Sequence, residues 1–137
     1  VSDEDYKYLN DSKRQMKLNG FKDGEFILDM TGRSPGFIYA LNAKPLLSNW
    51  VIGGYPNSND LLEYLLSEED CKKLNDAWIL TEPEGPRRLN IKYLLQKGIN
   101  IKDTNQYKKV VETKFNREKV YKQYLYKPLK NNNLNKC

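Results

Sequence analysis

Residues 26–41 read FILDMTGRSPGFIYAL and indicate the fold more clearly than any other stretch of the chain. Phe26-Ile27-Leu28 is a short apolar run followed by turn residues, a pattern typical of a buried strand. Ser34 and Pro35 then favour the start of a helix, because serine can act as the N-cap and proline suits the first helical position. The expected helix ends before Pro45.

The same order of apolar run, polar loop and helix occurs twice more. A second strand is expected at residues 50–54, and a helix follows it from Ser58. A third strand is expected at residues 78–81, followed by a helix that Asn90 caps. Three such units in about 75 residues predict an α/β fold with parallel strands and right-handed crossovers.

The last third of the chain has a different pattern. Residues 110–115 and 120–126 are rich in β-branched and aromatic side chains around a short turn region, which predicts an antiparallel hairpin at the sheet edge. The expected fold is therefore a three-layer, Rossmann-like α/β sandwich with a mainly parallel sheet and this C-terminal hairpin.

Length and polarity suggest one domain with two flanking segments. A chain of 137 residues suits one domain with a single core. We expect a linker or short lead-in helix over residues 1–24, the α/β domain over residues 25–129, and a disordered tail over residues 130–137. Gly20 can supply the left-handed cap that ends a helix in the first segment.

Composition excludes several kinds of site. The chain contains no histidine, which excludes Ser-His-Asp and Cys-His catalytic systems and any His-ligated metal centre. No apolar run approaches the roughly 20 residues needed to span a bilayer and no signal peptide is visible, so a soluble piece is expected. Cys71 and Cys137 have neither metal-binding nor redox spacing and can pair only if the tail folds back, which leaves their redox state open.

Positive charge is concentrated near the C-terminus. Residues 108–137 contain nine basic and two acidic side chains, a net charge of +7, whereas residues 1–107 carry a net charge of −2. Such a tail can bind nucleic acid, an anionic membrane or a phosphorylated ligand. A solvated lysine surface is an equally good interpretation.

Three loops carry the unusual residues, and each follows a predicted strand. They comprise residues 29–36, 53–60 and 81–88. In open α/β sheets ligands bind at the carboxyl ends of the strands, so parallel neighbours place such loops on one rim. The candidates for ligand binding there are Asp29, Thr31, Arg33, Ser34, Gly53, Gly54, Tyr55, Glu82, Glu84 and Arg87.

The first two loops also have a purely structural interpretation. Asp29 and Ser34 can bond backbone amides and cap the helix, instead of binding an anion at its N-terminus. Gly53 and Gly54 can form a tight turn, with Tyr55 packed on the protein and not stacked on a sugar or a base. The first loop lacks the spacing of a phosphate-binding P-loop.

The third loop contains paired acids. Glu82 and Glu84 lie two positions apart, so extended backbone places both carboxylates on one side. They can act as general acid and base on a glycoside, or bind a divalent cation. The favoured interpretation is an ion-pair network with Arg87 and Arg88 that holds the loop.

Four stretches together resemble a known family. They read FILDMTGRSPGFIYAL, WVIGGYPNSND, CKKLNDAWILTEPEGPRRL and KVYKQYLYKPL, within about residues 25–129. Their succession resembles the extracytoplasmic carboxyl-terminal domain of poorly characterised bacterial multi-pass membrane proteins, which are similar in layout to lipid-linked-sugar glycosyltransferases.

The resemblance implies a membrane portion upstream of Val1, a domain facing the periplasm or the exterior, and a role in the cell envelope in surface-glycan assembly. In this architecture the catalytic acid lies in a membrane-adjacent loop and not in the soluble domain. The family has a Gly-rich stretch before the last strand, whereas this chain has TKFNR at residues 113–117. A role tied to that stretch is therefore not carried over.

The favoured function is an accessory domain that binds a glycan or a lipid-linked sugar at the three-loop rim, with no cofactor, metal or specific nucleic acid. One alternative is a small hydrolase or transferase that uses Glu82 and Glu84. The other is a nucleic-acid-binding module that uses the basic tail, where Tyr121, Tyr124 and Tyr126 occur at strand spacing.

Overall fold

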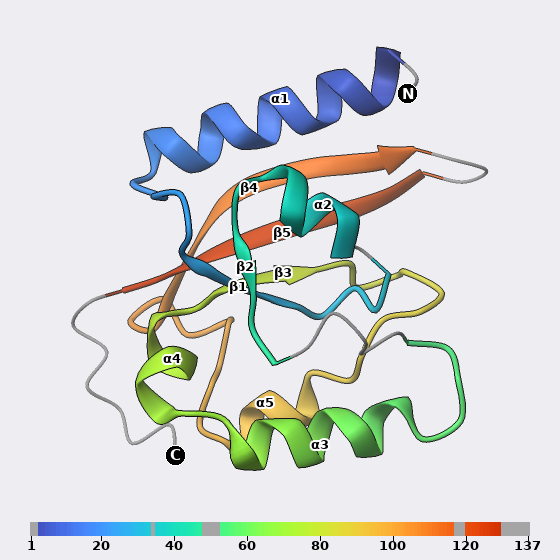
Figure 1. Ribbon diagram of the computed structural model, residues 1–137, viewed down its shortest axis with the longest axis vertical. Helices are drawn as coiled ribbons and strands as arrows, with labels where there is room; N and C mark the ends of the chain where they lie inside the picture. The colour runs from blue at the N-terminus through green and yellow to red at the C-terminus, as the bar shows by residue number, and fades with distance from the viewer. Residues whose placement is uncertain (1–2, 34, 48–52, 117–119, 130–137) are drawn as a thin grey trace.

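The computed structural model describes residues 3–33, 35–47, 53–116 and 120–129, and Figure 1 shows their arrangement. These residues form a mixed α/β fold built on a five-stranded mixed sheet. In chain order the elements are α1 (Asp3–Leu18), β1 (Phe26–Asp29), α2 (Pro35–Ala40), β2 (Lys44–Pro45), α3 (Ser58–Glu68), α4 (Cys71–Asp76), β3 (Trp78–Thr81), α5 (Lys92–Gln96), β4 (Tyr107–Asn116) and β5 (Val120–Pro128).

The sheet joins a parallel part to an antiparallel part, in the strand order β2-β1-β3-β5-β4. Strand β1 is parallel to both β2 and β3, with Leu28 opposite Ile79. Strand β5 pairs antiparallel with β3 and with β4, so the C-terminal hairpin extends the sheet beyond β3. The strands predicted near residues 26–30 and at 78–81 are confirmed, and so is the hairpin.

The second predicted parallel strand is not the one that forms beside β1. Residues 50–52 lie outside the described residues, and Gly53-Gly54 belong to a turn. The strand that pairs with β1 on the edge away from β3 is β2, a two-residue strand that follows α2 in the chain. The prediction of a strand over residues 50–54 is therefore wrong at Gly53 and Gly54, the two of these residues that the structure describes.

Strand β2 is held by backbone hydrogen bonds that its sequence does not predict. Lys44 N–H donates to Glu25 O and Leu46 N–H donates to Ile27 O, each at 2.9 Å. Pro45 lies between the two donors. It has no N–H group to donate to a further strand, so it suits a strand at the edge of the sheet. The proline that predicts the end of a helix thus belongs to a strand.

Two apolar clusters lie on opposite faces of the sheet, because successive strand residues point to opposite sides. One cluster contains Met16, Phe21, Ile27, Ile38, Leu41, Ala43, Trp78, Leu80, Val111 and Leu125. The other contains Leu28, Met30, Leu46, Leu62, Leu66, Leu74, Ala77, Ile79, Leu89, Leu94, Ile99 and Tyr107. Helices α1 and α2 therefore cover one face, and α3, α4 and α5 cover the other (Figure 1).

Helix α1 is joined to this core at its C-terminal end. Gly20 has a φ of 92° and its N–H donates to Lys17 O at 3.1 Å, while Phe21 N–H donates to Met16 O at 3.0 Å. These bonds end the helix with a left-handed glycine. Phe21 then packs edge-on against Trp78, with ring centroids 5.2 Å apart. The N-terminal helix thus shares a core with the sheet.

Adjacent leucines of α3 provide a matched test of the second cluster. Leu62 is 0% exposed, whereas Leu61 is 41% exposed. We expect Leu62→Ala to lower the free energy of unfolding by about 2–5 kcal/mol, because the lost side chain leaves a cavity. The control, Leu61→Ala, should lower it by less than about 1 kcal/mol. Urea unfolding measures both changes, and equal losses would contradict this assignment of the core face.

Candidate functional site

Three loops that are distant in sequence meet through their backbones. Gly53 N–H donates to Gly32 O at 2.9 Å. Both glycines also lie against the carbonyl of Arg87, and a Cβ at Gly32 or Gly53 would come within 1.9 or 1.6 Å of that oxygen. Side chains are excluded there by close backbone approach, so glycine is required at both positions. One residue from each predicted loop therefore lies at a common contact.

Asp29 organises the first loop through its own carboxylate. Its Oδ1 accepts hydrogen bonds from Thr31 N at 2.8 Å and from Thr31 Oγ1 at 2.5 Å. Thr31 Oγ1 in turn accepts a hydrogen bond from Arg33 N at 3.2 Å. Thr31 is buried, so these bonds satisfy polar groups that water does not reach. The contacts of Asp29 match its structural interpretation, a carboxylate bonded to a backbone amide.

Glu82, directly after β3, carries a buried carboxylate and is 1% exposed. Its Oε1 forms an ion pair with Arg33 Nη2 at 2.7 Å, and its Oε2 accepts a hydrogen bond from Gln123 Nε2 at 2.7 Å. The Arg33 guanidinium also lies over the ring of Tyr121, 5.0 Å from its centroid. Among the described residues the predicted ion pair with Arg87 or Arg88 does not form; Glu82 pairs instead with Arg33, which comes from the first loop.

The two acids of the third loop are separated. Gly85 N–H donates to Glu82 O at 2.9 Å, so the backbone turns between them instead of running extended. Glu82 points inward, whereas the side chain of Glu84 is exposed. The expectation that both carboxylates lie on one side is therefore wrong, and its reason is this turn.

A hydrogen-bonded chain continues from Glu82 to the N-terminal helix. Gln123 is buried on β5, and its Oε1 accepts a hydrogen bond from the Tyr8 hydroxyl on α1. Tyr8 also packs against Phe37 of α2, with ring centroids 4.7 Å apart. Sequence reasoning missed Gln123 and Tyr8, and the only available signal was one glutamine at an inward position of a strand.

The remaining candidates form a separate, outward-facing group. The Arg87 guanidinium lies 5.7 Å from the ring centroid of Tyr55, which is 61% exposed. Gly54 adopts a φ of 86° and lies beside the stem of Arg87. Ser34 lies outside the described residues. The structure therefore places Arg33 and Glu82 in one cluster and Tyr55 and Arg87 in another, and their role in ligand binding stays a prediction.

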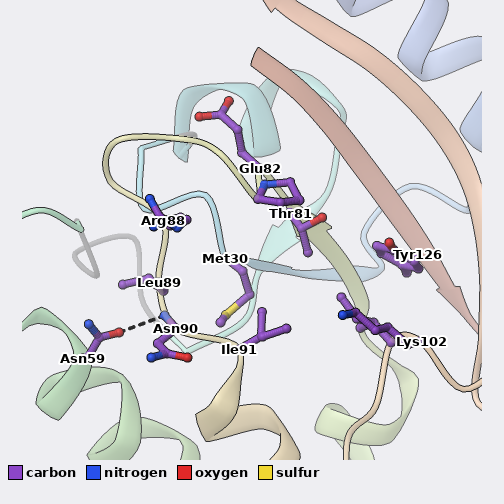
Figure 2. A pocket seen from close by; sticks show the side chains of 12 residues that line it. Met30, Asn59, Thr81, Glu82, Arg88, Leu89, Asn90, Ile91, Lys102 and Tyr126 are labelled. Atoms are coloured by element: carbon purple, nitrogen blue, oxygen red, sulfur yellow. Dashed lines mark hydrogen bonds between the residues drawn. The ribbon is translucent and has the colours of Figure 1, made fainter.

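An open pocket of about 610 Å³ lies at the carboxyl ends of β1 and β3. Its apolar lining consists of Met30, Pro83, Leu89, Ile91 and Ile101, and its polar lining of Asn59, Thr81, Glu82, Arg88, Asn90, Lys102 and Tyr126. Figure 2 shows the Glu82 carboxylate directed away from the other lining side chains. This location agrees with the rule that ligands bind beyond the carboxyl ends of parallel strands.

The pocket walls are tied together by side-chain hydrogen bonds. Asn59 Oδ1, at the start of α3, accepts from Asn90 N at 2.9 Å, the bond drawn dashed in Figure 2. Asn90 Oδ1 accepts from Lys92 N at 3.0 Å.

Burial raises the pKa of the Tyr126 phenol, and nearby Tyr124 and Glu112 raise it further. The Tyr126 hydroxyl is therefore neutral near pH 7 and can both donate and accept hydrogen bonds.

Most of this pocket is invisible to sequence reasoning. Of the nine candidates that the structure describes, only Glu82 contributes to the lining, and its carboxylate faces elsewhere. Arg88 lies in the third predicted loop, but it is not among the ligand-binding candidates, which include its neighbour Arg87. Lys102 follows α5 in a segment with no motif, so no local signal identifies it.

No protein-family model, curated protein or solved structure matches this chain. Within the described ranges, no three or more cysteine and acidic side chains are grouped so as to hold a metal ion. The same part of the chain contains no helix with the length and apolar character needed to cross a membrane.

The two acids of the third loop provide a test of the buried cluster. We expect Glu82→Ala to lower the free energy of unfolding by about 3–5 kcal/mol, because it leaves a buried charge on Arg33 without its partner. Glu84→Ala is the matched control and should change stability by less than about 0.5 kcal/mol. Chemical denaturation of both variants makes the comparison, and a Glu82→Ala protein as stable as the Glu84→Ala protein would refute the cluster's structural role.

The contact of the three loops can be tested at its glycines. Gly24 has a φ of 89° with its nearest neighbouring atom at 3.9 Å, so Gly24→Ala adds backbone strain alone, about 1–2 kcal/mol. Gly53→Ala places a Cβ against the Arg87 carbonyl, so it should lower the free energy of unfolding by more than Gly24→Ala does. Amide chemical shifts of Gly32 and Arg87 should also move in Gly53→Ala and stay in place in Gly24→Ala. Unmoved shifts in both variants would disprove the contact.

Proposed function

We propose that this chain is the extracytoplasmic domain of a membrane glycosyltransferase-like protein, and that it acts as an accessory domain which binds a glycan or a lipid-linked sugar in surface polysaccharide assembly. The observation that carries the proposal is the open pocket at the carboxyl ends of β1 and β3. Its volume of about 610 Å³ falls in the usual range for small-molecule sites.

The lining of the pocket has the two properties that a sugar requires. Asn59, Asn90 and Tyr126 offer amide and hydroxyl groups, which can donate to and accept from sugar hydroxyls. Ile91 and Ile101 offer apolar surface for the C–H face of a ring. A mixture of apolar walls and a few directed polar groups is typical of ligand pockets.

The carboxylates favour binding over turnover. Glycoside hydrolysis generally uses two carboxyl groups that flank one bond. In this pocket Glu82 is the acidic residue of the lining, and its carboxylate is engaged by Arg33 and Gln123. Glu84 is exposed and does not line the pocket. This arrangement supports an accessory role over a self-contained hydrolase built on these two acids.

The charges of the hairpin give little support to the nucleic-acid alternative. Lys109 and Lys122 both lie 3.8 Å from carboxylate oxygens of Glu112, and Lys127 donates to Asn19 O at 2.6 Å. Part of the positive charge of the described hairpin is therefore compensated within the protein.

We include in the proposal a three-layer, Rossmann-like classification of the fold, which the helices on both faces of the sheet support.

The proposal is tested by narrowing the pocket. We expect Ile101→Trp, in the lining, to weaken binding of a short-chain isoprenyl phosphoglucose by at least about tenfold, or about 1.4 kcal/mol. Leu95→Trp, on the exposed side of α5, is the control and should bind like the parent protein. Titration of the ¹⁵N-labelled protein reports affinity and site together. An unchanged affinity in Ile101→Trp, or no binding by the parent protein, would reject the function.

A further inference from the structure

The pocket described above carries unbalanced positive charge. Arg88 and Lys102 both line it, and Figure 2 shows them on different sides. The acid in the lining is Glu82, whose carboxylate turns to the other face of the sheet and pairs there with Arg33 at 2.7 Å. The charge that faces the pocket is therefore cationic.

Neighbouring acids do not neutralise these two cations. Asp103 follows Lys102 in sequence, but its carboxylate accepts from Asn105 N at 2.9 Å and from Gln106 Nε2 at 3.4 Å. Within the residues that the structure describes, neither Arg88 nor Lys102 forms an ion pair. Two cations without an acidic partner at one pocket attract an anionic group.

Arg88 is also held in position for such a group. Its Nη1 donates to Gly85 O at 3.0 Å, which restrains the guanidinium and leaves most of its N–H donors for another acceptor. The backbone of adjacent Arg87 is fixed against Gly32 and Gly53, so the start of this segment is anchored. A restrained guanidinium loses less conformational entropy when it binds an anion.

We infer that Arg88 and Lys102 form a phosphate subsite, and that the ligand class of this pocket is a phosphorylated sugar. A phosphate carries oxygens in tetrahedral directions, so cations on two walls can reach it at once, whereas a carboxylate presents both oxygens in one plane. The fork of Arg88 suits two phosphate oxygens, and the Lys102 ammonium supplies a point charge. The inference rests on the proposed function, because it assigns the sugar to the same pocket.

Binding of glucose 1-phosphate, glucose, glucuronate and inorganic phosphate to the ¹⁵N-labelled protein tests this assignment. Glucose 1-phosphate should bind most tightly and should shift amide signals near Asn90 and Lys102. Its affinity should fall at least about tenfold in Arg88→Gln and in Lys102→Gln, and should fall with added salt because charges are screened. Inorganic phosphate should bind at the same residues more weakly, which separates a free phosphate from one carried by a sugar.

Matched controls keep the test decisive. Arg14→Gln removes an exposed arginine of α1, on the other face of the sheet and outside the pocket lining, and should leave the affinity for glucose 1-phosphate unchanged. In the part of the chain that the structure describes, the Lys102 side chain forms no hydrogen bond, so Lys102→Gln should fold normally even if Arg88→Gln does not. Equal binding of glucose and glucose 1-phosphate would overturn the phosphate subsite but leave sugar binding intact. Binding of none of the four probes would overturn both.

Discussion

The carboxylate of Glu82 is removed from water at the end of β3, and a buried charge is tolerated only when it is paired and hydrogen-bonded. Arg33 and Gln123 meet this requirement from two other elements, the loop before α2 and strand β5. Gln123 is in turn held by Tyr8 of α1. One ionised group thus ties together the N-terminal helix, the first loop, the C-terminal hairpin and the central strand. Removal of any one partner leaves the others with unsatisfied polar groups in the interior.

This constraint also shapes the opposite face of the sheet. Because side chains alternate along a strand, the inward turn of Glu82 leaves Thr81 on the side of the pocket. The backbone then turns at Gly85 and passes Arg87 between two glycines. Arg88 follows immediately, so its position at the pocket depends on a contact made by its neighbour. The buried cluster and the pocket are two sides of one loop.

Sequence reasoning succeeded where the signal was local. The apolar runs of β1 and β3 are buried on both faces, and such runs are visible without knowledge of the fold. Strand β2 has no apolar run. It is placed by hydrogen bonds that the backbone N–H groups of Lys44 and Leu46 donate to Glu25 O and Ile27 O. The paired acids at Glu82 and Glu84 also predict an ion pair, but from the sequence its expected partners are the nearby Arg87 and Arg88. The true partners are Arg33 and Gln123, and Gln123 lies 41 positions away, so only the folded sheet brings them together.

Adjacent arginines illustrate why the candidate site could not be assigned from the sequence. Arg87 and Arg88 have the same chemistry, and no local pattern distinguishes them. In the structure the turn directs Arg87 over the exposed ring of Tyr55 and Arg88 to the pocket, where Gly85 O restrains it. The difference arises because Gly32 and Gly53 admit the Arg87 carbonyl, a close packing that fixes the direction of the chain at this point. The position of Arg88 at the pocket is therefore set by backbone packing among three distant loops, and not by the charged residues themselves.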